Sequence, residues 1–261
     1  MIKLIASDID GTLVTDGSHE LNPELYDVIL KLRAKGIQFA AASGRQWLSI
    51  ESIFGPIREK VFYLSDNGAY VGCHGRSLFI NTIERKTVMD MVEDVRNMDG
   101  LEVMICGPDM IYTESKDEEF LDWIVNGYRF HVKQVEELTK VDSEFIKVSV
   151  YRKTDVEAHT RILREKYADR LKITIAGDMW MDCMRPGINK GQAVKLLQDS
   201  LGIKPEETMA FGDQLNDVEM LKQAYYSFAV GNAREEVKAV ARFQADTNVN
   251  DGVLKILKLL L

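Results

Sequence analysis

Residues 3–13 read KLIASDIDGTL, and this stretch decides the fold. Its first half is an uninterrupted apolar run, Leu4–Ala6, which is typical of a strand that is buried on both faces of a sheet. Polar residues end the run at Asp8, and Asp10-Gly11 follows as a turn signal. A buried strand therefore delivers the carboxylates of Asp8 and Asp10 to its carboxyl end.

A helix and further buried strands that end in polar residues are predicted after this strand. Asn22-Pro23 predicts the start of a helix and Gly36 its end, with apolar residues spaced i, i+3, i+4 and i+7 between them. Buried strands are then expected at residues 37–42 and 61–64, and polar residues, Ser43 and Asn67, follow them. A strand, a helix and a second strand in this order form the βαβ unit of a parallel sheet.

The pattern changes between residues 82 and 186. A helix with Val88, Met91, Val92 and Val95 on one face precedes two short strands at 102–106 and 110–113. Residues 145–151 alternate apolar and polar side chains, which predicts a strand with one face in water. Thr154 and Glu157 have the spacing of a capping box, and Gly177-Asp178 is a hairpin turn signal between strands at 171–176 and 179–184. We therefore expect an inserted α+β domain at 82–186.

The βα pattern resumes after the insertion. A helix is predicted at 189–201, with its inward face made of Ala193, Leu196, Leu197 and Leu201. A strand at 208–211 ends in Gly212-Asp213, a helix at 217–224 and a strand at 226–230 follow, and the last helix runs from 250 to 261. The predicted fold class is α/β. Its core, residues 1–81 and 187–261, is a doubly wound and mostly parallel sheet that carries the α+β cap.

Composition excludes several classes of protein. The chain has 261 residues, of which 46% are hydrophobic, and its formal net charge is −8. Such a charge disfavours nucleic acid and anionic lipid as partners, and no apolar stretch is long enough to cross a bilayer. Cys73, Cys106 and Cys183 lie far apart, which indicates buried thiols rather than disulfides or a zinc site. We expect a cytoplasmic protein that binds neither nucleic acid nor membranes.

Polar residues at the strand ends should form one site. The carboxyl ends of parallel strands meet at one edge of a sheet, so Asp8, Asp10, Ser43, Asn67 and Asp213 should converge there. Crowded carboxylates need a cation, and ligands that are all oxygen suit Mg²⁺ better than zinc. Ser43, backbone N–H groups after Asp8, and Lys190 at the start of a helix would then match the oxygens of a phosphoryl group.

Four ordered motifs resemble those of the haloacid dehalogenase-like phosphatases, and most closely the Cof-like sugar-phosphate phosphatases. They are Asp8-Ile9-Asp10-Gly11-Thr12-Leu13, Ser43-Gly44-Arg45, Asn189-Lys190-Gly191 and Gly212-Asp213-Gln214-Leu215-Asn216-Asp217. The resemblance implies a phosphatase of small phosphorylated metabolites, with a large cap inserted between the second and third motifs. Dehalogenation is disfavoured, because dehalogenases lack an acid at the position of Asp10.

The resemblance also implies a role for each motif residue. Asp8 is the nucleophile and a Mg²⁺ ligand, and Asp10 is the general acid and base and offers its backbone carbonyl to the ion. Asp213 completes the protein ligands, with Asp217 beside them. The phosphoryl group is held by Gly11, Thr12, Ser43, Gly44, Lys190 and Asn216. Further contacts with the substrate are expected from Arg45, Asn67 and Asp182.

Two alternatives share this acidic cluster. A phosphosugar mutase differs only in passing the phosphoryl group to a substrate hydroxyl instead of water. A phosphoacceptor signalling domain also uses an Asp, a Ser or Thr and a Lys, but the long insertion and the second acid, Asp10, argue against it. The physiological substrate and the oligomeric state are left open by the residues.

Overall fold

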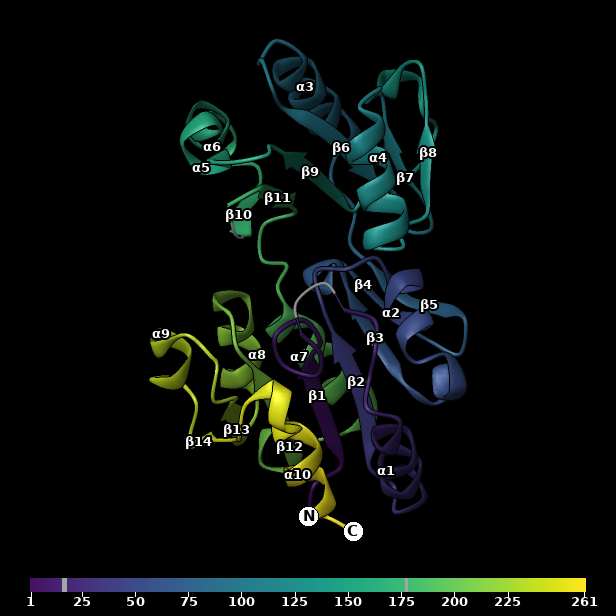
Figure 1. The fold of residues 1–261 in the computed structure, drawn as a ribbon, viewed down its shortest axis with the longest axis vertical. Helices are drawn as coiled ribbons and strands as arrows, with labels where there is room; N and C mark the ends of the chain where they lie inside the picture. Colours follow the sequence, from purple (N-terminus) through teal and green to yellow (C-terminus); the bar gives the residue numbers. More distant parts are fainter. Residues whose placement is uncertain (16–17, 177) are drawn as a thin grey trace. The chain divides into compact units, whose positions relative to one another are not determined.

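The structure is a computed structural model that describes residues 1–15, 18–176 and 178–261 (Figure 1). It divides into two compact units, one made of Met1–Phe79 and Asn189–Leu261 and the other of Ile80–Ile188. The insertion expected at 82–186 lies two residues inside the second unit at either end. In the described part of the chain, no helix is both long and apolar enough to cross a membrane.

The first unit is built on an eight-stranded sheet with the order β14-β13-β12-β1-β2-β3-β4-β5. Neighbouring strands are parallel from β14 to β3, and β4 pairs with β3 in the antiparallel sense. The strands are β1 (Leu4–Asp8), β2 (Gln38–Ala42), β3 (Phe62–Ser65), β4 (Tyr70–Cys73), β5 (Arg76–Ile80), β12 (Thr208–Gly212), β13 (Tyr226–Ala229) and β14 (Phe243–Gln244). The parallel α/β core that the sequence predicts is therefore confirmed.

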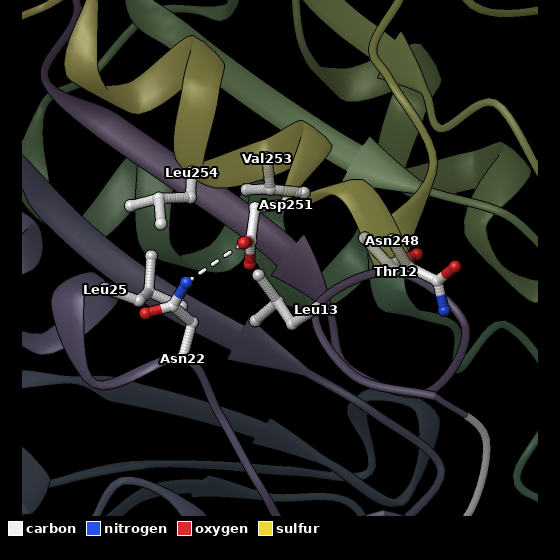
Figure 2. Close-up of a pocket in the computed structure, with 8 residues that line it drawn as sticks. All are labelled: Thr12, Leu13, Asn22, Leu25, Asn248, Asp251, Val253 and Leu254. Carbon is white, nitrogen blue, oxygen red and sulfur yellow. Dashed lines mark hydrogen bonds between the residues drawn. The ribbon is translucent and has the colours of Figure 1, made fainter.

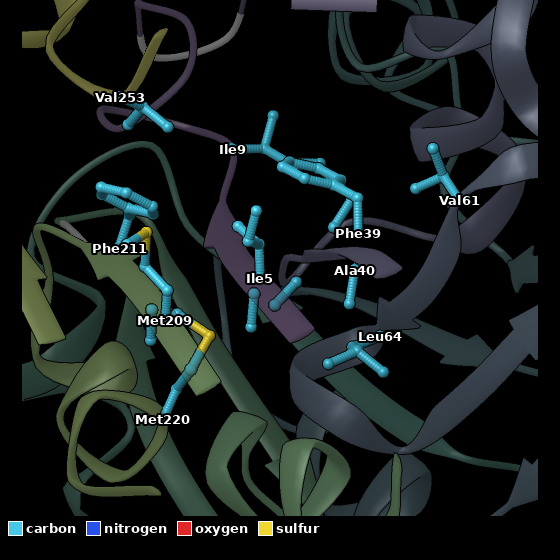
Figure 3. Packing of buried hydrophobic residues seen from close by; sticks show 14 of the residues in the cluster. Ile5, Ile9, Phe39, Ala40, Val61, Leu64, Met209, Phe211, Met220 and Val253 are labelled. Carbon is cyan, nitrogen blue, oxygen red and sulfur yellow. The ribbon is translucent and has the colours of Figure 1, made fainter. Parts of the chain in front are cut away.

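Helices cover this sheet, and β1 is buried along its whole length. α1 packs beside α10, and α7 packs beside α8. Figure 3 shows how Met209, Phe39 and Leu64 gather around Ile5 in the apolar core. The helices are α1 (Pro23–Ala34), α2 (Trp47–Ile53), α7 (Lys190–Leu201), α8 (Val218–Gln223), α9 (Glu235–Lys238) and α10 (Gly252–Lys258), with 3₁₀ turns at Gly55–Lys60, Asp66–Gly68, Pro205–Glu207, Leu215–Asp217 and Asn248–Asn250.

The second unit is an α+β module on a six-stranded sheet with the order β10-β11-β9-β6-β7-β8. Its pairs are antiparallel except for β7 with β8. The elements are α3 (Arg85–Arg96), β6 (Glu102–Cys106), β7 (Ile111–Thr113), α4 (Glu118–Asp122), a π-helical turn (Trp123–Gly127), β8 (Val132–Gln134), a 3₁₀ turn (Leu138–Lys140), β9 (Lys147–Tyr151), α5 (Val156–His159), α6 (Arg161–Tyr167), β10 (Lys172–Ala176) and β11 (Trp180–Met184).

The expectation of a wet face on residues 145–151 is wrong. All five residues of β9 are buried, including the polar Lys147 and Ser149. Ser149 Oγ donates a hydrogen bond of 2.7 Å to Asp182, and the ring of Tyr151 stacks on Phe120 at 4.6 Å between centroids. Both faces of this strand are therefore covered, and at its Tyr151 end the face that alternation assigned to water is packed by Phe120 of α4 and Trp123 of the π-helical turn.

Three local predictions also need correction. The capping box at Thr154 does not form: α5 follows Asp155, whose backbone is left-handed with φ of 55°. Leu201 is 41% exposed, because α7 ends there at the surface, and Val194 is buried in the helix face instead. The last helix ends at Lys258, three residues early. β10 and β11 pair as predicted, but Gly177 of their turn lies outside the described residues.

Candidate active site

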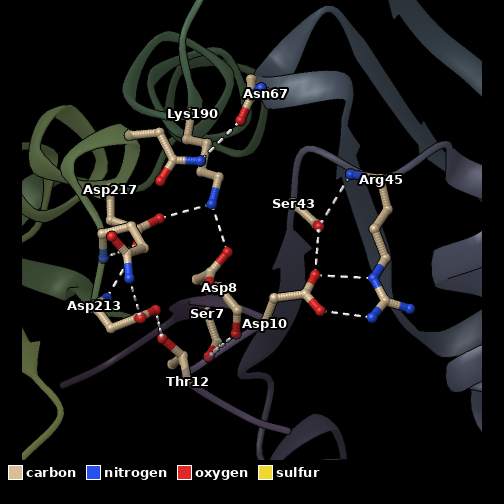
Figure 4. Close-up of polar contacts among 12 residues, drawn as sticks. Ser7, Asp8, Asp10, Thr12, Ser43, Arg45, Asn67, Lys190, Asp213 and Asp217 are labelled. Carbon is tan, nitrogen blue, oxygen red and sulfur yellow. Dashed lines mark hydrogen bonds and ion pairs between the residues drawn. The ribbon is translucent and has the colours of Figure 1, made fainter. Parts of the chain in front are cut away.

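Three carboxylates meet at the carboxyl edge of the first sheet. Asp8 is the last residue of β1, and Asp213 follows β12, which pairs in parallel with β1. Asp217 ends the 3₁₀ turn after Asp213. One carboxylate oxygen from each of the three lies within 4.8 Å of the other two, and all three residues are buried. The predicted convergence of Asp8 and Asp213 is what the structure shows (Figure 4).

Lys190 lies among these acids. Its Nζ is 2.5 Å from Oδ1 of Asp8 and 2.7 Å from Oδ1 of Asp217, and its side chain is 1% exposed. Asn189 places it at the first turn of α7 by accepting a hydrogen bond from the backbone of Gln192. A Cβ on Gly191 would come within 2.5 Å of the carbonyl oxygen of Glu219, so only glycine lets α7 approach α8 this closely.

The electrostatics of the cluster favour a cation. Burial, followed by the charge of Asp217, raises the pKa of Asp8 well above its usual range despite the opposing effect of Lys190. The same two causes raise the pKa of Asp213 to about 6. Burial works to lower the pKa of Lys190, but the charges of Asp217 and Asp8 outweigh it and raise the value. One ammonium group does not balance three buried carboxylates, so this donor set fits a hard divalent cation.

Two of these acids also hold the surrounding loops. Oδ2 of Asp217 accepts hydrogen bonds of 3.0 Å from the backbone N–H groups of Asp213 and Gln214. Asp213 in turn accepts from Thr12 Oγ1 at 2.8 Å. Asp217 therefore fixes Lys190 on one side and the loop after β12 on the other. The expected place of Asp217 beside the metal ligands stays a prediction.

The loop after β1 is shaped by Gly11. Its φ is +80°, and a Cβ there would lie 2.3 Å from Oδ2 of Asp213. The N–H groups of Gly11 and Thr12 donate to the carbonyls of Val14 and Ile9 inside the loop, at 2.9 and 3.2 Å. To bind a phosphoryl group, these two backbone donors would have to leave or share those partners.

A small cavity lies behind this loop. It measures about 10 Å³ and is lined by Thr12, Leu13 and residues of α1 and α10, with Asn22 donating a 3.0 Å hydrogen bond to Asp251 (Figure 2). A volume of about 10–15 Å³ holds one water molecule at most. The cavity is therefore too small for a substrate.

The carboxylate of Asp10 does not join the cluster. It faces Arg45, whose Nε lies 2.8 Å from Oδ2 and whose Nη2 lies 2.5 Å from Oδ1 (Figure 4). Ser43 Oγ is 3.5 Å from the same carboxylate. His19 lies 2.9 Å from Nη1 of Arg45, a neighbour that the sequence did not reveal, because the isolated histidine matches no motif. The structure thus separates the two aspartates of the first motif.

Asn67 and Asn216 lie side by side near Gly44. Nδ2 of Asn216 donates to Oδ1 of Asn67 at 3.0 Å, and a Cβ on Gly44 would touch the Asn67 amide at 3.4 Å. Asn67 sits in a left-handed turn, with φ of 54°. These three residues form a second group, with Gly44 and Asn216 from two of the four motifs and Asn67 from the 3₁₀ turn after β3. Asp182 belongs to the other unit, where it accepts the hydrogen bond from Ser149.

Comparisons with known proteins agree with this geometry. Residues 5–257 match the family model of the haloacid dehalogenase-like hydrolases. Two curated relatives are 5-amino-6-(5-phospho-D-ribitylamino)uracil phosphatases: YbjI of Escherichia coli (strain K12), 29% identical, and YcsE of Bacillus subtilis (strain 168), 27% identical, each aligned over 98% of this chain and 95% of its own length. The crystal structure of a protein from Eubacterium rectale has 35% identity and a TM-score of 0.93, covering 100% of this chain and 99% of that one.

The family match covers nearly the whole chain, and the relatives align over nearly their whole length. Both the fold and the resemblance expected from the motifs are thereby confirmed. The chain belongs to the haloacid dehalogenase-like hydrolases and is a phosphatase of their Cof-like branch.

Proposed function

We propose that this phosphatase hydrolyses small phosphorylated metabolites with the help of Mg²⁺, through an aspartyl-phosphate formed on Asp8. The observation that carries the proposal is the buried group of Asp8, Asp213 and Asp217 around Lys190. A cluster of this kind is costly to bury unless a cation balances it. Its place at the carboxyl edge of a parallel sheet is where such folds bind their ligands.

The proposed metal ligands are Asp8, Asp213 and the backbone carbonyl of Asp10. When bound, Mg²⁺ would neutralise the carboxylates and the phosphoryl oxygens, so that two negatively charged groups can approach each other. Asp217 would hold Lys190 and the loop that carries Asp213, as its present hydrogen bonds do.

The chain's own residues would carry out two steps. A carboxylate oxygen of Asp8 attacks phosphorus in line, the bond from phosphorus to the leaving oxygen breaks, and Asp10 gives that oxygen a proton. Asp10 then takes a proton from water, whose oxygen attacks the aspartyl-phosphate and releases phosphate and the free carboxylate. Lys190 and Ser43, with Gly11, Thr12, Gly44 and Asn216 around them, would hold the phosphoryl oxygens.

The substrate class we propose is a phosphate monoester of a sugar or a sugar alcohol. The Cof-like motifs imply sugar phosphates, and the names of YbjI and YcsE describe a substrate whose phosphate sits on a ribityl chain. Contacts of Arg45, Asn67 and Asp182 with such a substrate stay predictions. Screening sugar and polyol phosphates for released phosphate would identify the preferred member, and product analysis would exclude phosphoryl transfer to a second hydroxyl.

The nucleophile can be tested with Asp8→Asn, because an amide cannot attack phosphorus. We expect this variant to lose turnover of p-nitrophenyl phosphate and to form no acid-stable radiolabelled phosphoenzyme. Asp199→Asn is the control, since Asp199 is exposed and pairs with Lys195 on the surface of α7. EDTA should stop the wild-type reaction and Mg²⁺ should restore it. Retained turnover in Asp8→Asn would refute the assignment.

A further inference from the structure

Asp8 and Asp10 are two residues apart, yet their carboxylates have separate cationic partners. Asp8 pairs with Lys190, and Asp10 pairs with Arg45 through two hydrogen bonds of 2.8 and 2.5 Å. The pairing of Asp10 uses both of its carboxylate oxygens and the fork of the guanidinium group, which is the strong bidentate geometry. The Arg45 side chain is only 3% exposed.

Other contacts fix the guanidinium group in place. Nη2 of Arg45 also donates to the carbonyl of Ser18 at 2.9 Å, and Nη1 lies 2.9 Å from Nε2 of His19. The backbone N–H of Arg45 donates to Ser43 Oγ at 3.1 Å, and its carbonyl accepts from the N–H of Asp66 at 3.0 Å. Arg45 therefore presents a pre-oriented fork to Asp10, which a flexible lysine would not do.

The position of Asp10 creates a conflict that this pairing resolves. Asp10 follows Asp8 by two residues, and its charge acts on the Asp8 carboxylate. Asp8 belongs to a carboxylate cluster that fits a divalent cation, and such a cation attracts any further carboxylate within reach. A carboxylate captured as a metal ligand cannot give a proton to a leaving group or take one from water. The acid and base of the reaction must stay near the cation without binding it.

Building on the proposed function, we propose that Arg45 is a positioning residue that keeps the Asp10 carboxylate out of the metal site. The pair of hydrogen bonds competes with the pull of the cation, and the anchors at Ser18 and His19 stop Arg45 from following Asp10 inward. The nucleophile and the acid-base group can then lie two residues apart in one loop without exchanging roles.

The first test is metal affinity, which does not depend on turnover. In Arg45→Met, Asp10 loses its bidentate partner and can add a ligand to the metal site, so Mn²⁺ measured by titration with electron paramagnetic resonance should bind about tenfold tighter. Arg45→Lys, which keeps the charge but not the fork, should fall between this variant and the wild type. Arg164→Met, which removes a surface ion pair with Glu157, is the control and should bind as the wild type does.

A double-mutant cycle shows whether the effect passes through Asp10. In the background Asp10→Asn, Arg45→Met should no longer tighten Mn²⁺ binding, because an amide is a poor ligand for the ion. If the affinity rises equally in both backgrounds, or does not rise in Arg45→Met or Arg45→Lys, the proposal is overturned. If Arg45→Met does not fold, the Mn²⁺ affinity of Arg45→Lys tests the proposal instead.

Rapid-quench kinetics give the second test. p-Nitrophenolate leaves without much help from an acid, so Arg45→Met should release one equivalent quickly and then turn over about a hundredfold more slowly than the wild type, with the phosphoenzyme accumulating. A raised KM with unchanged kcat would instead make Arg45 a substrate contact and overturn the proposal. If the wild-type protein forms no phosphoenzyme on Asp8, the proposed function itself fails. If the wild type forms the phosphoenzyme and Arg45→Met turns over at the same rate, only the proposed role of Arg45 is refuted.

Discussion

Replacing Lys190 by Met removes a buried cation from between two buried carboxylates. Its Nζ lies 2.5 Å from Asp8 and 2.7 Å from Asp217, whose side chains are 6% and 0% exposed. Removing one partner of a buried ion pair costs about 3–5 kcal/mol, because the remaining charges are neither solvated nor compensated. We therefore expect the free energy of unfolding of metal-free Lys190→Met to fall by about 3–5 kcal/mol near neutral pH.

The same helix offers a matched control. Lys195 pairs with Asp199 one turn later at 2.6 Å, but these side chains are 49% and 65% exposed. A surface pair at this spacing contributes only about 0.3–0.5 kcal/mol, so Lys195→Met should lose no more than that. Both variants change a lysine of α7 to the same apolar residue, so helix propensity and side-chain length largely cancel in the comparison.

Urea denaturation followed by circular dichroism measures the difference. In EDTA, Lys190→Met should unfold at a much lower urea concentration than Lys195→Met with a similar slope. Mg²⁺ should recover part of the loss in Lys190→Met, because a divalent cation replaces the missing positive charge. If the two variants have equal stability in EDTA, Lys190 does not compensate the cluster, and the electrostatic reasoning is refuted.

Two further predictions concern the carboxylate cluster. Because the pKa of Asp213 is raised to about 6, the folded protein binds a proton there that the unfolded chain releases near pH 4, so metal-free stability should fall by about 2–3 kcal/mol as pH rises through this window. The difference in unfolding free energy between wild type and Asp213→Asn, measured from pH 4 to 7 in EDTA, should show this slope; a flat difference would contradict it. Gly11→Ala should destabilise by more than about 1 kcal/mol and weaken Mg²⁺ binding, since its Cβ would meet Asp213 and its φ is +80°. Calorimetric titration of Mg²⁺ checks this, and unchanged affinity would show that the loop yields without moving Asp213.

The core strands could be predicted from sequence because two signals coincide in them. β1, β2, β3 and β12 are short apolar runs that end abruptly in polar residues, which is the pattern of buried parallel strands. β4 and β5 were not predicted, because Tyr70–Cys73 and Arg76–Ile80 are short and flank a glycine turn without clear alternation. α4 was missed too, since its five residues are too few to show a helical repeat.

The contacts in the site also differ in how far the sequence predicts them. That Asp8 and Asp213 meet follows from topology alone, because the carboxyl ends of neighbouring parallel strands share an edge. The direction in which Asp10 points depends instead on a side-chain contact with Arg45, 35 residues later in the chain. Neither periodicity nor a motif encodes that contact. Likewise, the sequence shows that apolar and polar residues alternate in β9, but it does not show that Phe120 packs on the ring of Tyr151.

Glycines around the cluster allow its like charges to pack closely together. Gly11 and Gly212 lie where a Cβ would come within 2.5 Å of Asp213 or of Asp217, so their backbones approach the acids more closely than ordinary residues would allow. Gly191 lies 2.5 Å, by the same measure, from the backbone carbonyl of Glu219 and lets α7, which carries Lys190, approach α8. Burial, together with this close approach of Asp217, raises the pKa of Asp8 and Asp213 and destabilises the metal-free protein. A cation that binds this cluster in the folded state alone would restore part of that free energy. We therefore expect two results of the same close packing, an affinity for a divalent cation and a less stable metal-free form.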